Sequence, residues 1–249
     1  MSTKISATIV TLNEEENIGR CLNSIKDLVS EIVVVDSGST DKTIEIAKKE
    51  GAKIYNHVFT NFADQKNFAL SKTSEGWILS LDADEEIPEE LAQEIQLAVE
   101  GIKYNGYLIP RKNFILGAQI KHSWWSPDAH IWLWRKGMGK WVGKVHEEVV
   151  VEGEVGRLKN QKNHYQSSKV EDFIESNNLY STIMAKQLFE KNKKFSLFNM
   201  FFYPSGEFFI RYFYKLGFLD GWRGFALSYL MSVYWVMVWV KLYEIQRNK

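Results

Sequence analysis

The order of apolar and polar residues changes along the chain and predicts its elements. In the first hundred residues, apolar β-branched runs typical of buried parallel strands alternate with stretches of helical period. Strands are predicted at 5–12, 31–36, 52–55 and 76–81. Helices are predicted from Asn13, which is expected to cap the first one, from Asp41 to about Gly51, over 64–71 and from Pro88. This alternation predicts an α/β fold, in which a parallel sheet carries helices on both faces.

A different pattern follows Gly101. Residues 106–113 alternate as an antiparallel or edge strand would, and the runs 131–135 and 140–145 flank a glycine-containing turn that predicts a hairpin. Ser168 and Glu171 form a predicted capping box, which opens an amphipathic helix to about Lys194. The predicted organisation is an α/β domain at 1–165 in two halves (1–104 and 105–165), a long helix at 166–194 and a tail at 195–249.

The tail is rich in aromatic and basic residues. It holds 18 of the 35 Phe, Trp and Tyr residues, and residues 191–249 carry nine Lys and Arg against three Asp and Glu, in a chain without net charge. Residues 224–240 form a run of 17 without a charge, at the lower limit of length for a membrane-spanning helix. This mixture predicts a helical hairpin lying in a membrane surface, with a soluble helical appendage or a dimer interface as the alternative.

The composition is that of an ordinary globular protein with one cysteine. A chain of 249 residues can bury a sizeable core, and a single cysteine excludes an internal disulfide. Cys21 shares a helical stripe with Ile18, Leu22 and Ile25, which predicts core packing. The N-terminal residues show no signal-peptide pattern, which favours a cytoplasmic location.

Two carboxylates, Asp82 and Asp84, follow the predicted strand at 76–81. Ligands of open α/β sheets bind outside the carboxyl ends of the strands, where polar ends at 13–14 and Asp36 are also expected. Such an oxygen-only pair suits Mg²⁺ or Mn²⁺ holding a diphosphate. The chain has neither a Gly-x-Gly-x-x-Gly motif nor a P-loop, so a divalent cation would have to neutralise the phosphates.

Three motifs together resemble family 2 inverting glycosyltransferases of the GT-A fold. They are Thr-Ile-Val-Thr-Leu-Asn at 8–13, Val-Val-Val-Asp-Ser-Gly-Ser-Thr-Asp at 33–41 and Leu-Asp-Ala-Asp-Glu at 81–85. The resemblance continues more loosely through His146-Glu147 and 218–225, and it points in particular to bacterial β-glucosyltransferases of lipopolysaccharide-core assembly. It implies a GT-A (Rossmann-like) domain whose halves bind a nucleotide-sugar and an acceptor.

The resemblance also implies which residues bind the donor, a UDP-sugar with UDP-glucose preferred. Asp36 would accept hydrogen bonds from uracil, Asp82 would hold the ribose or the sugar, and Asp84 would bind the metal directly. The other donor-binding candidates are Thr11, Asn13, Glu15, Ser37, Asp64, Lys66 and Ala83. For Asp36 the alternative is a carboxylate that caps the following turn, and Asp64 and Lys66 have purely structural alternatives.

An inverting transfer needs one base to deprotonate the acceptor hydroxyl. By resemblance Glu147 is this base, and His146 is a further ligand of the metal or the diphosphate. Asp128, in a loop, is the second candidate base. The alternative is that Glu147 and Glu148 are ordinary exposed charges at the start of a strand.

Five of the nine tryptophans lie between residues 124 and 141. Because tryptophan faces bind the apolar faces of sugar rings, one or two of the five are expected to line the acceptor cleft. Trp124 and Trp125 are the candidates by their loop position. Two or three of the five are expected to be core residues.

These features predict a metal-dependent inverting glycosyltransferase that moves a sugar, glucose by resemblance, from a UDP-sugar to a membrane glycolipid such as lipopolysaccharide core. The enzyme would work at the cytoplasmic face of the inner membrane, held there by its tail, and without a nucleic-acid partner. The sequence defines no oligomeric state. Two alternatives stay open: a polyprenyl-phosphate sugar transferase, whose acceptor needs no base, and a catalytically silent membrane adaptor that binds nucleotide-sugars.

Overall fold

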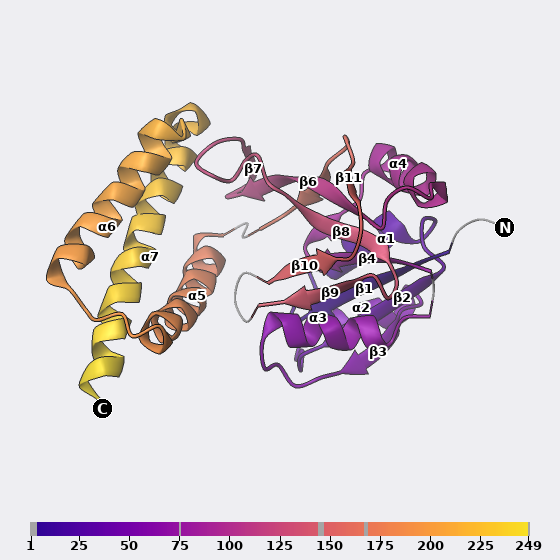
Figure 1. The fold of residues 1–249 in the computed structure, drawn as a ribbon, viewed down its shortest axis with the longest axis horizontal. Helices are drawn as coiled ribbons and strands as arrows, with labels where there is room; N and C mark the ends of the chain where they lie inside the picture. Colours follow the sequence, from indigo (N-terminus) through magenta and orange to yellow (C-terminus); the bar gives the residue numbers. More distant parts are fainter. Residues whose placement is uncertain (1–3, 75, 144–146, 167–168, 249) are drawn as a thin grey trace. The chain divides into compact units, whose positions relative to one another are not determined.

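The computed structural model describes residues 4–74, 76–143, 147–166 and 169–248, and the chain forms two compact units (Figure 1). Met1–Arg111 and Ala129–His164 make up the first, here called the sheet unit. Lys112–Asp128 and Tyr165–Lys249 make up the second, the helical unit.

Parallel strands form the first half of the sheet. Their order is β3 (Lys53–Asn56), β2 (Glu31–Asp36), β1 (Ile5–Thr11) and β4 (Trp77–Asp82). The path continues through β8 (Ala129–Arg135), β6 (Gly106–Ile115), β12 (Lys162–His164) and β5 (Glu85–Glu86), while β7 (Ala118–Ile120) and β11 (Val155–Arg157) pair with β6. β8 is antiparallel to both of its neighbours, β4 and β6.

Helices cover both faces of the parallel strands. On β2, Val34 joins the large buried cluster that includes α1 (Ile18–Ile25), α2 (Thr43–Lys49) and α4 (Glu89–Glu100). Val33 and Val35 instead pack with Ala69 of α3 (Phe62–Ser71). Because successive strand residues point to opposite faces, the helices lie on two sides of the sheet. The predicted α/β fold class, with its helical tail, is confirmed.

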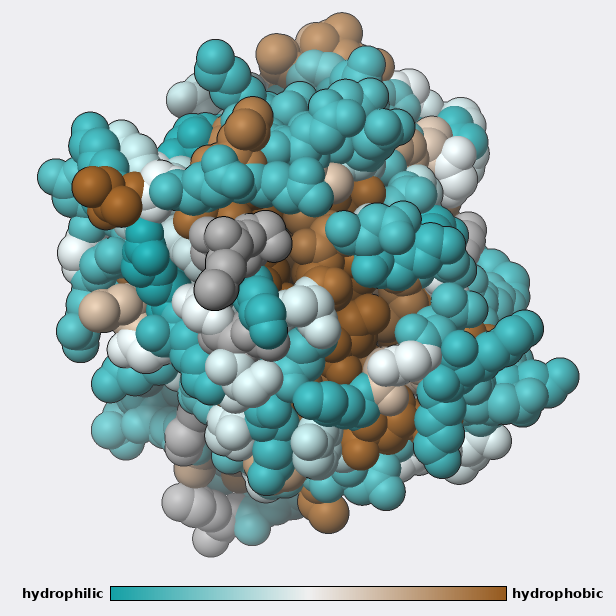
Figure 2. Space-filling view, turned by 90° about the vertical axis from the view of Figure 1, so that its right-hand side faces the viewer, coloured by the Kyte–Doolittle hydropathy of each residue, from teal (hydrophilic) through white to brown (hydrophobic). Residues whose placement is uncertain are grey.

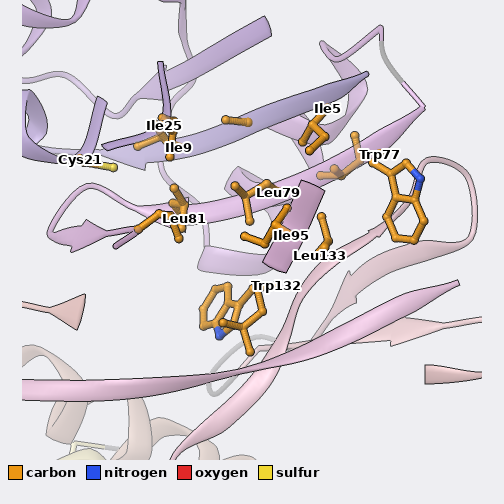
Figure 3. Close-up of a cluster of buried hydrophobic side chains, with 14 of the residues drawn as sticks. Ile5, Ile9, Cys21, Ile25, Trp77, Leu79, Leu81, Ile95, Trp132 and Leu133 are labelled. Atoms are coloured by element: carbon orange, nitrogen blue, oxygen red, sulfur yellow. The ribbon is translucent and has the colours of Figure 1, made fainter. Parts of the chain in front are cut away.

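The main core fills the space between the sheet and its helices (Figure 3). Ile9, Leu79 and Ile95 are completely buried there, and Cys21 is buried among them as its helical stripe predicted. Burying one aliphatic side chain of this size contributes about 1.5–3 kcal/mol to stability. Trp132, Trp134 and Trp141 also belong to this core, at 5%, 0% and 5% exposure, so three of the five clustered tryptophans have the expected structural role.

Two local predictions are wrong. Asn13 does not cap a helix: its backbone is left-handed (φ 55°), its side-chain oxygen accepts from the Thr40 N–H, and α1 begins only at Ile18. The hairpin across residues 136–139 does not form either. β8 is already paired on both edges, so the chain leaves the sheet and β9 (Gly139–Val142) pairs with β10 (Glu148–Val151) in a separate two-stranded sheet.

Besides strand β7, the described part of the helical unit contains three α-helices and two short turns. They are α5 (Val170–Glu190), α6 (Leu197–Phe209), which continues into a π-turn at Ile210–Tyr214, and α7 (Gly221–Arg247), preceded by a 3₁₀ turn at Gly217–Asp220. α6 and α5 both pack along α7 (Figure 1). Asp172 accepts from the Lys169 N–H at the start of α5, while the predicted cap Ser168 lies outside the described residues.

The face drawn in Figure 2 and the surface of α6 and α7 differ in polarity. Hydrophilic residues cover most of the face drawn in Figure 2, with apolar atoms gathered in a central band. In the helical unit, by contrast, α6, α7 and their turn expose many large apolar side chains, among them Phe198, Phe201, Phe202, Phe213, Trp222 and Tyr229. Among the described residues, the segment Gly217–Arg247 is by length and composition apolar enough to cross a membrane, and a third of its most apolar window is buried.

Candidate active site

Three polar strand ends lie next to one another at the carboxyl edge of the parallel sheet. In the strand register, Thr11 of β1 is opposite Asp36 of β2, and Val10 of β1 is opposite Asp82 of β4. Asp84 follows Asp82 in the turn between β4 and β5, with Ala83 buried between them. This edge is where parallel α/β sheets bind ligands, and the predicted donor residues of the strands gather here.

Asp36 is the most enclosed of these carboxylates, at 3% exposure. Its oxygens accept the Gly38 and Ser39 N–H groups, both at 2.9 Å, and the Ser39 hydroxyl at 2.5 Å. These bonds shape the turn after β2, as the structural alternative for Asp36 expected. The predicted contact with uracil stays a prediction.

Other residues predicted to bind the UDP-sugar hold the loops after β1 and β2 together. Asn13 accepts from the Thr40 N–H, and Glu15 accepts from the Lys42 N–H, each at 2.9 Å. The Ser37 hydroxyl accepts from the Gln65 side chain of α3 at 2.9 Å. These residues therefore position the loops around the strand ends.

Lys66 connects the strand ends to the predicted base. Its ammonium group lies 3.0 Å from Asp82 Oδ1 and 2.9 Å from Glu147 Oε1, although the side chain is only 4% exposed. Burial alone would lower the pKa of Lys66, but the two carboxylates raise it, so the cation stays charged. Its charge and, to a smaller extent, that of Lys162 outweigh the burial of Asp82 and lower the pKa of that carboxyl.

Two tryptophans and an asparagine fix the position of Lys66. The ammonium lies 4.5 Å from the centroid of the Trp141 ring and 5.3 Å from that of Trp132. Asn67, the next residue of α3, donates to the Trp141 carbonyl and accepts from its N–H. α3 therefore holds β9, which ends five residues before Glu147, in place.

Asp64, two residues earlier in α3, has other partners. Its carboxylate accepts from the Thr60 hydroxyl at 2.7 Å and lies 3.0 Å from His57 Nε2. These hydrogen bonds lower the pKa of Asp64. Asp64 and Lys66 thus have different partners, and the role of Asp64 in donor binding stays a prediction.

The pairing of β12 with β5 adds residues that the sequence did not indicate. His164 is opposite Glu85, and its Nε2 lies 3.2 Å from Asp84 Oδ2. Burial lowers the pKa of His164, but the Asp84 carboxylate outweighs this effect and raises it. Lys162, two residues earlier, is fully buried and pairs with Glu85 at 2.5 Å, and burial lowers its pKa to about 8.

Glu14 is a further acid at this edge. Burial raises its pKa to about 7, and the nearby charges of Asp84 and Asp82 act in the same direction. Glu14 thus belongs to the acidic rim that the strand-end pattern predicted. His146, the predicted additional metal ligand, lies outside the described residues.

The side chains of Asp84 and His164 could bind a divalent cation whose other ligands come from a substrate. Asp84 and His164 provide one carboxylate and one imidazole side by side. Across the residues that the structure describes, no group of three His, Cys, Asp or Glu side chains forms a closed metal site. Mg²⁺ and similar ions in phosphoryl sites use one or two protein carboxylates and complete their shell with phosphate oxygens and water, which this pair allows.

The remaining candidates lie in the helical unit. Asp128, the second candidate base, accepts from the Asn113 side chain at 3.0 Å. Trp125 packs with Phe173 and a buried cluster, whereas Trp124 is 47% exposed. Their predicted roles toward an acceptor stay predictions.

Comparison with known proteins identifies the family. The model for glycosyl transferase family 2 matches residues 6–141. An uncharacterized glycosyltransferase of Rickettsia typhi, RT0209, is 33% identical over 88% of this chain and 80% of its own length. The lipopolysaccharide core biosynthesis glycosyltransferase LpsC of Rhizobium meliloti is 30% identical over 96% of this chain and 92% of its own length.

Parts of the chain also resemble solved structures. S. aureus TarS in complex with UDP-GlcNAc superposes with a TM-score of 0.48 at 18% identity, covering 73% of this chain and 66% of TarS. Glucosyl-3-phosphoglycerate synthase of Mycobacterium tuberculosis has a TM-score of 0.37 at 28% identity, covering 45% and 44% of the two chains. The family match and the full-length relatives together show that this chain belongs to glycosyl transferase family 2 and is a glycosyltransferase.

Proposed function

We propose that the protein is a metal-dependent inverting glycosyltransferase that moves a sugar from a UDP-sugar to a membrane glycolipid. The observation that carries the proposal is the cluster of Lys66, Asp82 and Glu147, because it joins the strand end predicted to hold the donor to the predicted base. A relative over nearly the whole chain is named as a lipopolysaccharide core glycosyltransferase, which supports a glycolipid acceptor.

Each residue of the cluster has a role in the proposed reaction. The acceptor oxygen forms a bond to the anomeric carbon while the bond from that carbon to the UDP oxygen breaks on the opposite face. Glu147 takes the proton of the acceptor hydroxyl, and Asp82 holds the ribose or the sugar. Lys66 pairs with both carboxylates and lowers the pKa of Asp82.

A divalent cation would be held by Asp84 and His164. When bound, it would neutralise the negative charge that develops on the departing diphosphate. Burial raises the pKa of Glu14 to about 7, so near neutral pH this carboxyl adds less negative charge to the acidic rim than an ordinary glutamate would. His146 would add a ligand as the resemblance implies.

The tail would hold the enzyme at the cytoplasmic face of a membrane, beside its lipid acceptor. The support is the apolar segment Gly217–Arg247 and the many exposed aromatic side chains of α6 and α7. Trp, Tyr and basic residues together favour the interface between lipid and water. Confinement to the same surface raises the effective concentration of acceptor and enzyme.

The test starts with donor binding measured by calorimetry on the full-length protein. UDP and UDP-glucose should bind in the presence of Mn²⁺ or Mg²⁺ and much more weakly with chelator. Transfer is then measured with radiolabelled UDP-glucose and bacterial lipid extracts. UDP binding that does not depend on metal contradicts the proposed cation site. Metal-dependent UDP binding without hydrolysis or transfer of any donor sugar would favour the catalytically silent adaptor.

A further inference from the structure

A lysine lies between two exposed aromatic rings in the helical unit. The Lys215 ammonium is 5.3 Å from the centroid of the Trp124 ring and 5.4 Å from that of Tyr214. Trp124 is 47% exposed and Tyr214 77% exposed. We call these three residues the ring–lysine cluster. A cation near aromatic faces is stabilised there while its outer side stays accessible.

The neighbouring acids are already engaged within the helical unit. Glu207 pairs with Arg211 at 2.6 Å. Asp220 accepts from the backbone N–H groups of Lys121 and His122 and lies 3.0 Å from His122 Nδ1. Over the described part of the chain, no carboxylate forms an ion pair with Lys215. This cation is therefore available to an anion from outside the protein.

The loop that carries Trp124 is held in an unfavourable conformation. Ser123 and Trp124 of this loop have φ angles of 58° and 66°, and Leu216 of the adjoining turn has 57°. This left-handed region costs residues other than glycine about 1 kcal/mol each. Hydrogen bonds stabilise it: the Ser123 N–H donates to the Lys215 carbonyl, and Arg211 Nη1 donates to the Ser123 carbonyl. Strained residues that are fixed by their surroundings are typical of ligand sites.

Glycine at position 217 permits this close approach. A Cβ atom on Gly217 would lie 2.2 Å from the Ser123 hydroxyl and 2.8 Å from the Arg211 carbonyl. The Ser123 hydroxyl, which donates to that same carbonyl, would have to move. The turn and the loop are thus built to keep Trp124 beside Lys215.

The surroundings of the cluster are apolar and exposed. Six large apolar residues of the turn between α6 and α7 and of the start of α7 are each 44–63% exposed: Phe213, Leu216, Phe218, Leu219, Trp222 and Phe225. A soluble anion would compensate the charge of Lys215 but leave these side chains in water. An anionic lipid in a bilayer provides a negative phosphate and an apolar layer together, and Trp, Tyr and Lys side chains are favoured at that interface.

We propose that the ring–lysine cluster binds the phosphodiester headgroup of an anionic phospholipid at a bilayer surface. Lys215 contacts the phosphate, while Trp124 and Tyr214 lie among the headgroups. The inference rests on the proposed membrane association of the tail, and it adds a specific contact and a preference for anionic lipid.

The experiment is flotation of the full-length protein with vesicles of phosphatidylcholine alone or mixed with phosphatidylglycerol. The wild type should float more strongly with the mixed vesicles. Lys215→Gln should reduce the partition coefficient for mixed vesicles about five-fold, since one basic residue near an anionic surface is worth about 1 kcal/mol, and Lys215→Arg should retain it. Trp124→Ala should weaken binding with an unchanged thermal unfolding curve.

Lys186→Gln is the matched control, because Lys186 is an exposed lysine of α5 whose loss changes the net charge equally. Equal losses in the two glutamine variants would indicate diffuse attraction and overturn the site. Release of the protein from the vesicles by inorganic phosphate at constant ionic strength would also overturn the inference, because the cluster would then bind a free anion rather than a lipid headgroup. Equal flotation with both vesicle types also overturns the inference but leaves membrane association intact, whereas a wild type that floats with neither contradicts the membrane part of the proposed function.

Discussion

The two ends of the parallel sheet use their carboxylates differently. At the amino end, Glu31 of β2 pairs with Lys53 at 2.7 Å and accepts from the Ser6 hydroxyl and the Ser74 N–H, with 4% of its side chain exposed. At the carboxyl end, Asp82 pairs with Lys66 and Asp84 lies 3.2 Å from His164 Nε2, and the two carboxylates keep 30% and 21% of their side chains exposed. A carboxylate whose oxygens are all hydrogen-bonded inside the protein stabilises the fold, whereas one that can still accept hydrogen bonds from outside can bind a ligand.

A buried cation can both stabilise the fold and position the site. Lys66 and Lys162 are almost completely buried, and each is paired with a carboxylate, because an unpaired buried charge would be strongly unfavourable. Lys162 pairs with the fully buried Glu85, while Lys66 pairs with two carboxylates that solvent can still reach. The pair of Lys162 and Glu85 therefore stabilises the fold, whereas Lys66 both stabilises the fold and positions the carboxylates of the site.

The largest expected effect is on chemistry at the carboxyl end. Glu147→Gln should reduce sugar transfer by about 10²–10⁴-fold, the usual contribution of a general base, while UDP binding and thermal unfolding change little. The measurement is initial transfer rate together with calorimetry. Asp128→Asn is the companion variant for the second candidate base. Full transfer by Glu147→Gln, Asp128→Asn and their combination would favour the polyprenyl-phosphate acceptor, which needs no base.

Lys66→Met should affect stability and chemistry together. It leaves Asp82 and Glu147 without their shared cation, and breaking such a pair costs about 3 kcal/mol of unfolding free energy. Lys66→Arg should recover most of the stability, since a guanidinium can pair with both carboxylates. Denaturant unfolding and kcat measured at saturating donor separate the two effects. An unchanged unfolding free energy in Lys66→Met contradicts the role of the cluster.

Asp84→Asn should weaken the metal dependence of UDP binding. Replacing a ligand or its close partner commonly costs 10–100-fold in metal affinity. The measurement is calorimetric titration of Mn²⁺ in the presence of UDP, with His164→Gln as the second variant because the two side chains are 3.2 Å apart. Wild-type Mn²⁺ affinity in both variants would exclude this pair as the cation site.

The sequence predicts the parallel strands and their polar ends well, because each depends on a local pattern. The apolar runs gave β1, β2 and β4, and the register brings Thr11, Asp36 and Asp82 to one edge. The sequence does not predict that His164 reaches Asp84, because 80 residues separate them and only the pairing of β12 with β5 joins them. No local signal distinguishes His164 from the other four histidines.

The errors of prediction have the same origin. Residues 136–139 are typical of a hairpin turn, but β8 pairs with β4 on one edge and with β6 on the other, so no edge is left for β9. Asn13 has the chemistry of a helix cap, yet its side chain accepts from the Thr40 N–H of the neighbouring loop. In both cases a tertiary partner competes with the local structure and wins.

The smallest expected effect tests the amino end of the sheet. Burial alone would raise the pKa of Glu31, but its hydrogen bonds from Lys53, Ser6 and Ser74 lower it from 4.5 to about 2. A carboxylate whose folded pKa lies below its unfolded value contributes stability above pH 4.5, and this contribution disappears as the pH falls through 2. Glu31→Gln should therefore cost about 2 kcal/mol at pH 7, the worth of hydrogen bonds to a charged group, and less toward pH 2.

The measurement is urea unfolding at several pH values between 7 and 2. The difference in unfolding free energy between wild type and Glu31→Gln should shrink through this window, and Glu100→Gln, an exposed control on α4, should show no such trend. Transfer activity per folded molecule should be unchanged in Glu31→Gln, because its partners are at the opposite end of the strands from Asp82. Loss of activity in the folded variant would contradict the division of roles between the two ends of the sheet.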